Sequence, residues 1–210
     1  MYSAVKCFVM DPVPFVRVSL RRYSPNSTCL GGRIHSAVVV IEPKQPEETT
    51  LGYDPTDKSI LVSDSWNHGD PRWPKKCDRC DYQFVDHDEW QYFPKHLYAR
   101  RDQPEIVQTI EEFAPGALWR LPWMEDSEAY RGVDGQSWMC RCPSGHDWMI
   151  DARANNCTMP DDTKHKCWCR HGEAPEFHVD KVGLTCAAGA GSIVAGDYHG
   201  FLHNGWLTAG

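Results

Sequence analysis

The sequence predicts a β-rich α+β fold of short strands, with one or two helices near residues 86–114 and stabilisation by bound metal. Residues 1–75 contain 8 of the 15 prolines, which disfavour long helices there. Residues 86–114 carry apolar side chains three or four positions apart, the period of a helix face. Residues 117–210 return to turns and short apolar runs. We therefore expect an N-terminal region 1–116 and a Cys/His-rich β region 117–210, which can also form one continuous domain.

Strands are expected in the N-terminal region. Phe15–Arg21 alternates in part between apolar and polar residues, as a half-buried strand does. Residues 34–41 end in the run Val38–Ile41, which indicates a buried strand that Pro43 terminates. Residues 58–62 form a third candidate strand.

Residues 86–114 show two helix signals. Asp86–Glu89 resembles a capping box with acidic residues in the first helical turn. Pro94 would kink the first helix, and Pro104 suits the first position of a second one. Their apolar faces would contain Trp90, Phe93 and Leu97, followed by Ile106, Val107, Ile110 and Phe113.

Hairpins are expected in the C-terminal region. Trp138–Cys142 and Trp148–Asp151 flank a Pro-Ser-Gly turn. From residue 186 onward Asp197 is the one charged side chain, so this tail must be packed. Tyr198–Leu207 is predicted to be a hairpin that turns at Asn204-Gly205, with Phe201 and Trp206 buried.

Composition excludes several classes of protein. The chain has 29 acidic and 22 basic residues, a net charge of −7, which disfavours a nucleic-acid partner bound by a broad basic surface. The apolar stretch 187–195 is shorter than the ~20 residues of a membrane helix. Residues 1–20 contain charges and prolines, unlike a secretory signal. We expect a soluble protein, without membrane or nucleic-acid partners, made in a reducing compartment.

Ten cysteines and ten histidines point to metal. Cys77-Asp78-Arg79-Cys80 is a CxxC knuckle, which supplies two of the four ligands of a structural zinc. Candidates for the other two are Cys29, His35 and His68, with His87 less suitable because it would lie in a helical turn. A redox CxxC normally opens a helix, and here the expected helix starts later. Disulfide-paired or plain buried cysteines stay open as alternatives.

A second set of cysteines and histidines lies in the C-terminal region. On a strand, Cys140 and Cys142 would share one face, as would His165, Cys167, Cys169 and His171. Two such faces could bind one zinc or form disulfides. Cys167, Cys186 and His199 with one of Cys140, Cys142 or Cys157 would serve equally well. Spacing does not choose among these sets.

Catalytic signals are weak. His146, Asp147 and Asp151 lie near cysteines and near the predicted hairpin, but they lack a recognisable set of catalytic partners, and His146 and Asp147 directly follow a turn, as common surface residues do. The sequence contains no HExxH, GxSxG, GxGxxG or phosphate-loop motif. We therefore expect no catalytic residues and a protein that is not an enzyme.

Three segments resemble an uncharacterised family encoded by tailed bacteriophages and prophages: the GHxWMIDxRxxNC pattern of residues 145–157, Gly191-Ser192-Ile193, and the HGFLxNG pattern of residues 199–205. The resemblance implies a phage origin and zinc binding, with no known activity. Because the nearly uncharged C-terminal tail suggests a surface that partners complete, we expect a virion decoration, neck or tail subunit, or an assembly accessory. Such a protein would be made in the host cytoplasm, enter the virion and contact other virion subunits. The alternatives are an intracellular phage metalloenzyme, a hydrolase or modifying enzyme, and a module that binds a host protein.

Overall fold

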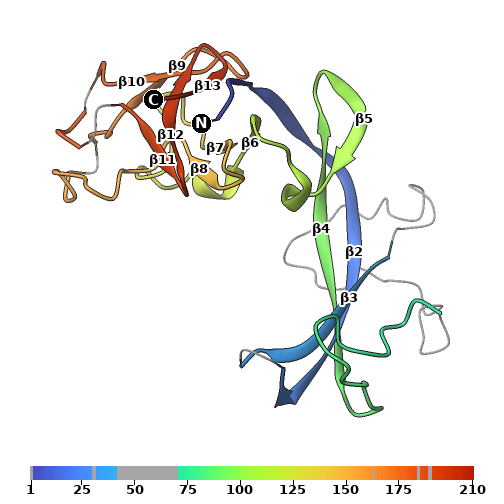
Figure 1. Cartoon of the computed structure of the whole chain (residues 1–210). Helices are drawn as coiled ribbons and strands as arrows, with labels where there is room; N and C mark the ends of the chain where they lie inside the picture. The colour runs from blue at the N-terminus through green and yellow to red at the C-terminus, as the bar shows by residue number, and fades with distance from the viewer. Residues whose placement is uncertain (1, 30–31, 42–70, 163, 184, 189–190) are drawn as a thin grey trace. The chain divides into compact units, whose positions relative to one another are not determined.

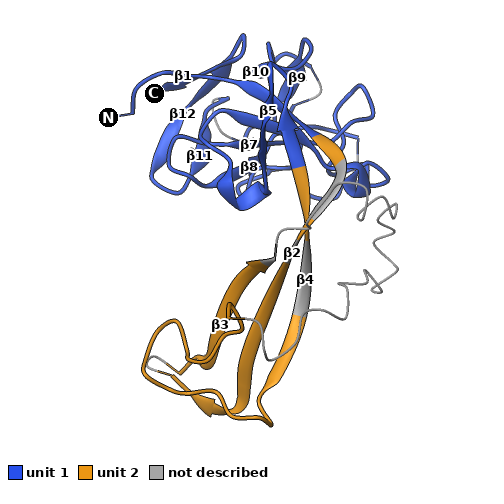
Figure 2. Cartoon of the chain, turned by 90° about the vertical axis from the view of Figure 1, so that its right-hand side faces the viewer, with its two compact units in different colours: residues 1–11, 98–210 blue, residues 12–97 orange. Residues whose placement is uncertain are grey.

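The structure is a computed structural model that describes residues 2–29, 32–41, 71–162, 164–183, 185–188 and 191–210. The chain forms two compact units (Figure 2). Unit 1 contains Met1–Asp11 and Tyr98–Gly210, and unit 2 contains Pro12–Leu97. This division differs from the one expected at residue 116, because the N-terminal residues join the C-terminal part of the chain.

Unit 2 is organised by two long strands that continue into it from unit 1. These are β2 (Phe8–Thr28) and β4 (Glu89–Arg100), which are neighbours in one sheet (Figure 1). β3 (Ile34–Ile41) pairs antiparallel with β2. The strands predicted at 15–21 and 34–41 are therefore confirmed as strands, but the second one is not buried as expected, because Val38 and Val40 are exposed. The candidate strand at 58–62 lies outside the described residues.

The helices predicted at residues 86–114 are wrong. This segment forms the hairpin of β4 with β5 (Gln103–Gln108), and its helical content is the 3-10 turn η2 (Ile110–Glu112). Its many aromatic and β-branched residues favour a strand, and Pro94 disfavours a helix interior. The Asp88 carboxylate accepts the Val85 N–H at 2.8 Å, closing a turn before β4 instead of capping a helix.

Unit 1 contains three groups of strands. β6 (Ala117–Arg120), β7 (Trp138–Arg141) and β8 (Asp147–Met149) pair antiparallel, and β6 also runs parallel to the start of β2. A second sheet has the order β1 (Val5–Lys6), β13 (Trp206–Ala209), β12 (Tyr198–His203) and β11 (Ile193–Ala195). β9 (Cys169–His171) and β10 (His178–Asp180) form a two-stranded ribbon. A 3-10 turn, η3 (Pro122–Met124), follows β6.

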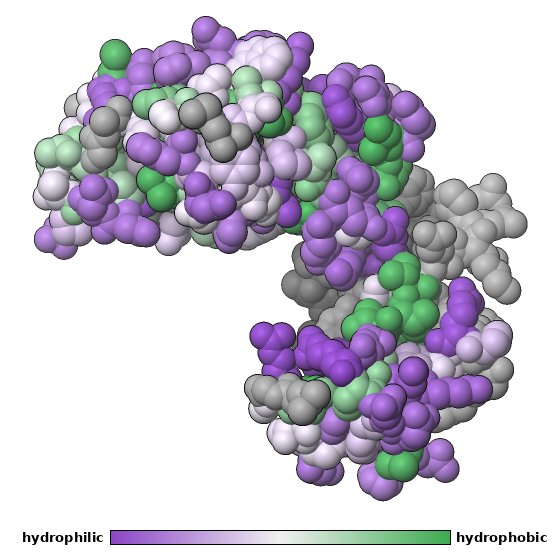
Figure 3. All heavy atoms as spheres, in the orientation of Figure 1, coloured by the Kyte–Doolittle hydropathy of each residue, from purple (hydrophilic) through white to green (hydrophobic). Residues whose placement is uncertain are grey.

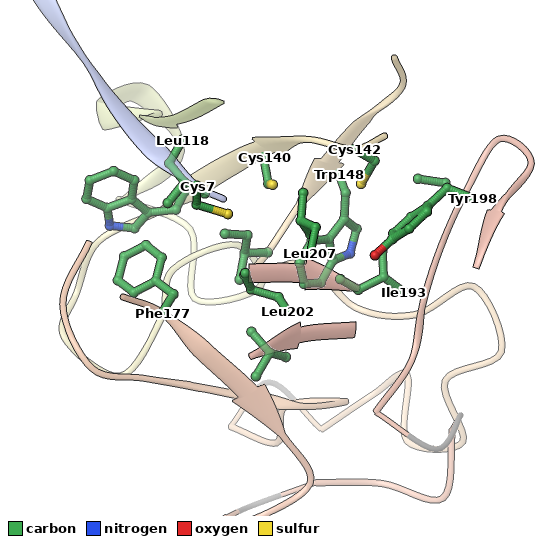
Figure 4. Close-up of a cluster of buried hydrophobic side chains, with 14 of the residues drawn as sticks. Cys7, Leu118, Cys140, Cys142, Trp148, Phe177, Ile193, Tyr198, Leu202 and Leu207 are labelled. Atoms are coloured by element: carbon green, nitrogen blue, oxygen red, sulfur yellow. The ribbon is translucent and has the colours of Figure 1, made fainter. Parts of the chain in front are cut away.

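The main core of unit 1 is aromatic and aliphatic, and three thiols lie within it (Figure 4). Tyr198, Leu202 and Leu207 come from the second sheet and are fully buried. Trp138 and Phe177 meet edge to face with their ring centroids 5.1 Å apart. These contacts hold the short strands together, which would be only marginally stable alone.

The C-terminal hairpin is confirmed, with one correction. β12 and β13 pair antiparallel, and Asn204 and Gly205 both have positive φ, 47° and 76°, as a type I′ turn requires. Leu202 faces Leu207 across the strands, and both point into the core. Because side chains alternate along a strand, Phe201 is only half-buried and Trp206 points outward and is 42% exposed, contrary to the prediction for both.

Hydrophilic side chains cover much of the face of unit 1 that Figure 3 shows, and hydrophobic residues form separate patches. Among the described residues, no helix has the length and apolar character needed to cross a bilayer. The described residues are β-rich, as expected from the sequence, and they contain none of the expected α-helices.

Candidate metal centres

Four side chains of unit 2 converge in what we call centre 1. Cys29, His35, Cys77 and Cys80 each offer one ligand atom, and these atoms all lie within 4.8 Å of one another. Cys29 directly follows β2 and His35 lies on β3. The structure thus brings together four residues that the sequence analysis proposed as ligands.

The CxxC knuckle is fixed against β3. The Cys77 N–H donates to the Tyr82 carbonyl at 2.9 Å, which closes the loop. The Asp78 N–H donates to the Ser36 carbonyl at 3.1 Å, and the Asp78 carboxylate accepts the Val38 N–H at 3.0 Å. These bonds hold the Cys77 and Cys80 thiols beside β3, the strand that carries His35.

His35 is oriented by its neighbours. Its Nδ1 atom lies 3.2 Å from the Cys80 sulfur. Its ring stacks on Tyr82, with the centroids 4.1 Å apart. The Tyr82 hydroxyl donates in turn to the Asp88 carboxylate at 3.2 Å. Supporting contacts of this kind fix the ring orientation that a metal ligand requires.

Four side chains of unit 1 form centre 2. Cys157, His165, Cys167 and Cys186 also place their ligand atoms within 4.8 Å of one another. The Cys167 and Cys186 sulfurs are 3.6 Å apart, and His165 Nε2 is 3.1 Å from the Cys157 sulfur. His165 Nδ1 is 2.6 Å from the Asp162 carbonyl oxygen and so carries the proton. Nε2 therefore keeps its lone pair for a ligand bond.

Backbone amides point at a thiol in both centres. The Arg79 N–H donates to Cys77 at 3.5 Å, and the Met159 and Ala188 N–H groups donate to Cys157 and Cys186 at 3.4 Å. In each case the amide lies two residues after the cysteine. Such donors stabilise the thiolate, which is the form that binds metal.

Lys181 binds the backbone carbonyl groups around centre 2. Its ammonium group donates to the carbonyl oxygens of Cys167, Cys186 and Ala188, the latter two at 2.8 Å. One cation thereby joins the segments that carry two of the four ligands.

The pKa values of the thiols diverge within each centre. Burial raises the pKa of Cys77, but hydrogen bonds from Arg79 and His35 outweigh it and lower that pKa to about 6. Cys186 has a pKa lowered to about 6 in the same way, by amide donors that overcome burial. Burial and the adjacent thiols raise the pKa of Cys167 to about 11. One thiol in each centre therefore ionises readily. Ionisation of all three thiols of a centre requires a cation bound between the sulfur atoms.

Other predicted ligands lie elsewhere. Cys140 and Cys142 are buried with Cys7 in the core of unit 1 (Figure 4). Hydrogen bonds with Cys142 and Cys7, together with burial, raise the pKa of Cys140 well above its usual range, so it stays a thiol. His199 is exposed on β12, because the neighbouring Tyr198 and Gly200 take the inward positions of that strand. His68 lies outside the described residues, and exposed His87 belongs to neither centre.

Two ligands of centre 2, Cys167 and Cys186, are among those expected to bind metal together. The other two, Cys157 and His165, belong to alternative sets. Cys157 was one of the alternatives, and His165 was expected on a strand face together with Cys169. β9 begins only at Cys169, so Cys157, His165 and Cys167 all lie outside that strand. The His165-x-Cys167 pair downstream of Cys157 was the available signal.

Two of the three residues weighed for catalysis, Asp147 and Asp151, make structural contacts. Asp151 is buried, and its carboxylate accepts hydrogen bonds from Arg170 Nε at 3.0 Å and the Trp138 N–H at 3.1 Å. Burial raises the pKa of Asp151 to about 6, although Arg170 opposes this shift. Asp147 pairs with Arg141 at 2.6 Å, and His146 is exposed.

Each centre offers three sulfurs and one imidazole nitrogen, a set that could hold one tetrahedral metal ion. All ten cysteines are free thiols, and the Cys167 and Cys186 sulfurs, 3.6 Å apart, lie well beyond the ~2.05 Å of a disulfide bond. Comparison of the chain with protein-family models, curated proteins and solved structures finds no match in any of the three.

Proposed function

We propose that this protein is a non-enzymatic structural or interaction subunit whose two units are each stabilised by one Zn²⁺ in a Cys3His site. The observation that carries the proposal is the convergence of four buried or half-buried ligand atoms within 4.8 Å in each unit. Cys3His is one of the standard ligand sets of structural zinc.

The spacing of the ligand atoms supports zinc. With Zn–S bonds of about 2.3 Å, two sulfurs of a tetrahedron lie about 3.7 Å apart. Cys167 and Cys186 are 3.6 Å apart, close to this value. The sulfur–nitrogen distances of 3.2 Å in centre 1 and 3.1 Å in centre 2 are shorter than the ~3.6 Å of a Zn–S and a Zn–N bond at a tetrahedral angle, so zinc binding would move each imidazole slightly away from its sulfur. Oxygen-preferring ions such as Mg²⁺ and Ca²⁺ do not suit this donor set.

The number of protein ligands supports a structural role. A catalytic zinc keeps one position for water or substrate, whereas four protein ligands fill the tetrahedron. Centre 1 also coincides with a small apolar cluster of unit 2, where Cys29 and Cys77 pack with Ala37 and Phe84. Zinc binding would therefore contribute directly to the folding free energy of that unit.

The test is to count zinc by native mass spectrometry of untagged protein purified without chelator. We expect two zinc ions per chain. Cys77→Ser and Cys186→Ser should each lose one ion, because each removes a ligand from a different centre. Cys142→Ala is the matched control, a buried cysteine outside both centres, and should keep two. A wild-type chain without zinc, or one whose zinc survives both serine variants, would overturn the proposal.

The place of such a subunit in a phage particle rests on the sequence resemblance in residues 145–157 and 191–205. The proposed partners are other virion proteins. Quantitative mass spectrometry of purified particles tests this part: a fixed copy number supports it, and absence from particles contradicts it.

A further inference from the structure

We propose that unit 1 has a third metal site, open to solvent and distinct from both Cys3His centres. His171, His178 and Asp180 form it, and it binds a divalent transition-metal ion such as Zn²⁺. Two imidazoles and one carboxylate are a recurrent ligand set for ions that keep open coordination positions.

The β9–β10 ribbon places the three side chains on one face. His178 is directly opposite His171 in the antiparallel register, and cross-strand partners share a face. Asp180 lies two residues after His178 on the same strand, so its side chain points the same way. The backbone alone thus brings two imidazoles and a carboxylate together.

Both imidazoles contact the Asp180 carboxylate, each through a different oxygen. His171 Nε2 lies 3.0 Å from one carboxylate oxygen of Asp180, and His178 Nε2 lies 3.4 Å from the other. Bonds of about 2.1 Å from a metal to nitrogen or oxygen place adjacent ligand atoms about 3.0 Å apart in an octahedron and about 3.4 Å apart in a tetrahedron. The carboxylate lies between the imidazoles, and binding of one ion by all three side chains requires the half-exposed His171 ring to rotate toward His178.

Neighbouring groups prepare the site for a cation. The Val182 N–H donates to the Asp180 carboxylate at 2.8 Å, and this bond together with His171 lowers the pKa of Asp180. His203 of β12 stacks on His178, with the ring centroids 4.6 Å apart. The Nδ1 atom of His178 is buried without a partner among the described residues, so Nε2 is its nitrogen that meets the carboxylate.

The site is accessible, unlike the two centres. The side chains of His171, His178 and Asp180 are 44%, 33% and 31% exposed. His171 also lines a groove of about 460 Å³ together with Lys166 and Cys169. Water can therefore complete the coordination, and exchangeable binding weaker than that of a thiolate centre is expected.

Isothermal titration tests the site. Zn²⁺ is added to untagged protein that already carries its tightly bound zinc and has been dialysed to remove the excess. We expect one further equivalent. His171→Ala and His178→Ala should each weaken this binding at least tenfold, and Asp180→Asn should weaken it while keeping the oxygen that accepts the Val182 N–H.

His199→Ala is the matched control, because His199 is an exposed histidine of the same unit outside the ribbon. It should leave the further equivalent unchanged, and every variant should keep its tightly bound zinc, which shows that the fold is intact. Absence of a further equivalent, or equal weakening in His199→Ala and His171→Ala, would overturn the proposal. The tight equivalents are counted separately, so failure of the two Cys3His centres would appear as a different result.

Discussion

Arg170 is a buried guanidinium that joins three segments of unit 1. Its side chain is 3% exposed and pairs with Asp151, which is equally buried, at 3.0 Å. It also pairs with Asp134 at 2.8 Å and lies over the Phe177 ring, 4.6 Å from the centroid. A buried ion pair adds little net stability, but removing one partner leaves the other charge unpaired in a medium of low dielectric, which destabilises the fold.

Arg170→Met should therefore lower the free energy of unfolding by about 3–5 kcal/mol. Burial already raises the pKa of Asp151 to about 6 with the arginine present, and loss of the cation raises this pKa further. A protonated Asp151 is uncharged and needs no cationic partner. The decrease in the free energy of unfolding caused by Arg170→Met should therefore be smaller at pH 6 than at pH 8. Urea denaturation at both pH values measures it.

The double variant Arg170→Met/Asp151→Asn is the control. It removes both charges and should recover part of the stability lost in Arg170→Met. A single variant as stable as the wild type would mean that Asp151 is adequately solvated without Arg170.

At the scale of elements, local patterns predicted the strands better than the helices. The Val38–Ile41 run and the Asn204-Gly205 turn are local signals, and β3 and the β12–β13 hairpin follow them. The apolar spacing in residues 86–114 fitted a helix equally well, because aromatic residues at irregular intervals match both periods. Pairing of this segment with β2 and β5 selects the strand, and these contacts with other segments cannot be read from the local sequence pattern.

Gly205→Ala should destabilise unit 1 through the hairpin. Gly205 has φ +76°, where an L residue costs about 1–2 kcal/mol. An added Cβ would also lie 2.9 Å from the Pro175 carbonyl oxygen. Gly135→Ala is the matched control, since Gly135 has φ +78° with open space around its Cβ position. The urea midpoint should fall further for Gly205→Ala, and equal shifts would show that the contact yields easily.

At the scale of the whole molecule, one Cys3His centre lies in each compact unit. The CxxC spacing of Cys77 and Cys80 was visible in the sequence, because both ligands belong to one turn. Which distant cysteines meet was not, since that depends on strand register and loop paths. Cys140 and Cys142 have the alternation of a metal-binding strand, yet it directs them into an apolar core.

The two units should lose their metal-dependent stability separately. Cys77→Ser should increase the proteolytic sensitivity and amide exchange of unit 2 and leave unit 1 protected, whereas Cys186→Ser should do the reverse. Hydrogen–deuterium exchange measured by mass spectrometry resolves the two. Loss of protection in both units from either variant would contradict this expectation.

Lys181 gives centre 2 a simple charge balance. Three thiolates and one Zn²⁺ together carry one net negative charge, and the Lys181 ammonium on the surrounding carbonyl groups supplies one positive charge. The zinc-bound centre and the Lys181 ammonium together carry no net charge. Dissolved salt therefore has little electrostatic field at this centre to screen. The rate at which a chelator removes zinc from it should therefore be nearly independent of ionic strength, and Lys181→Met should make that rate sensitive to salt.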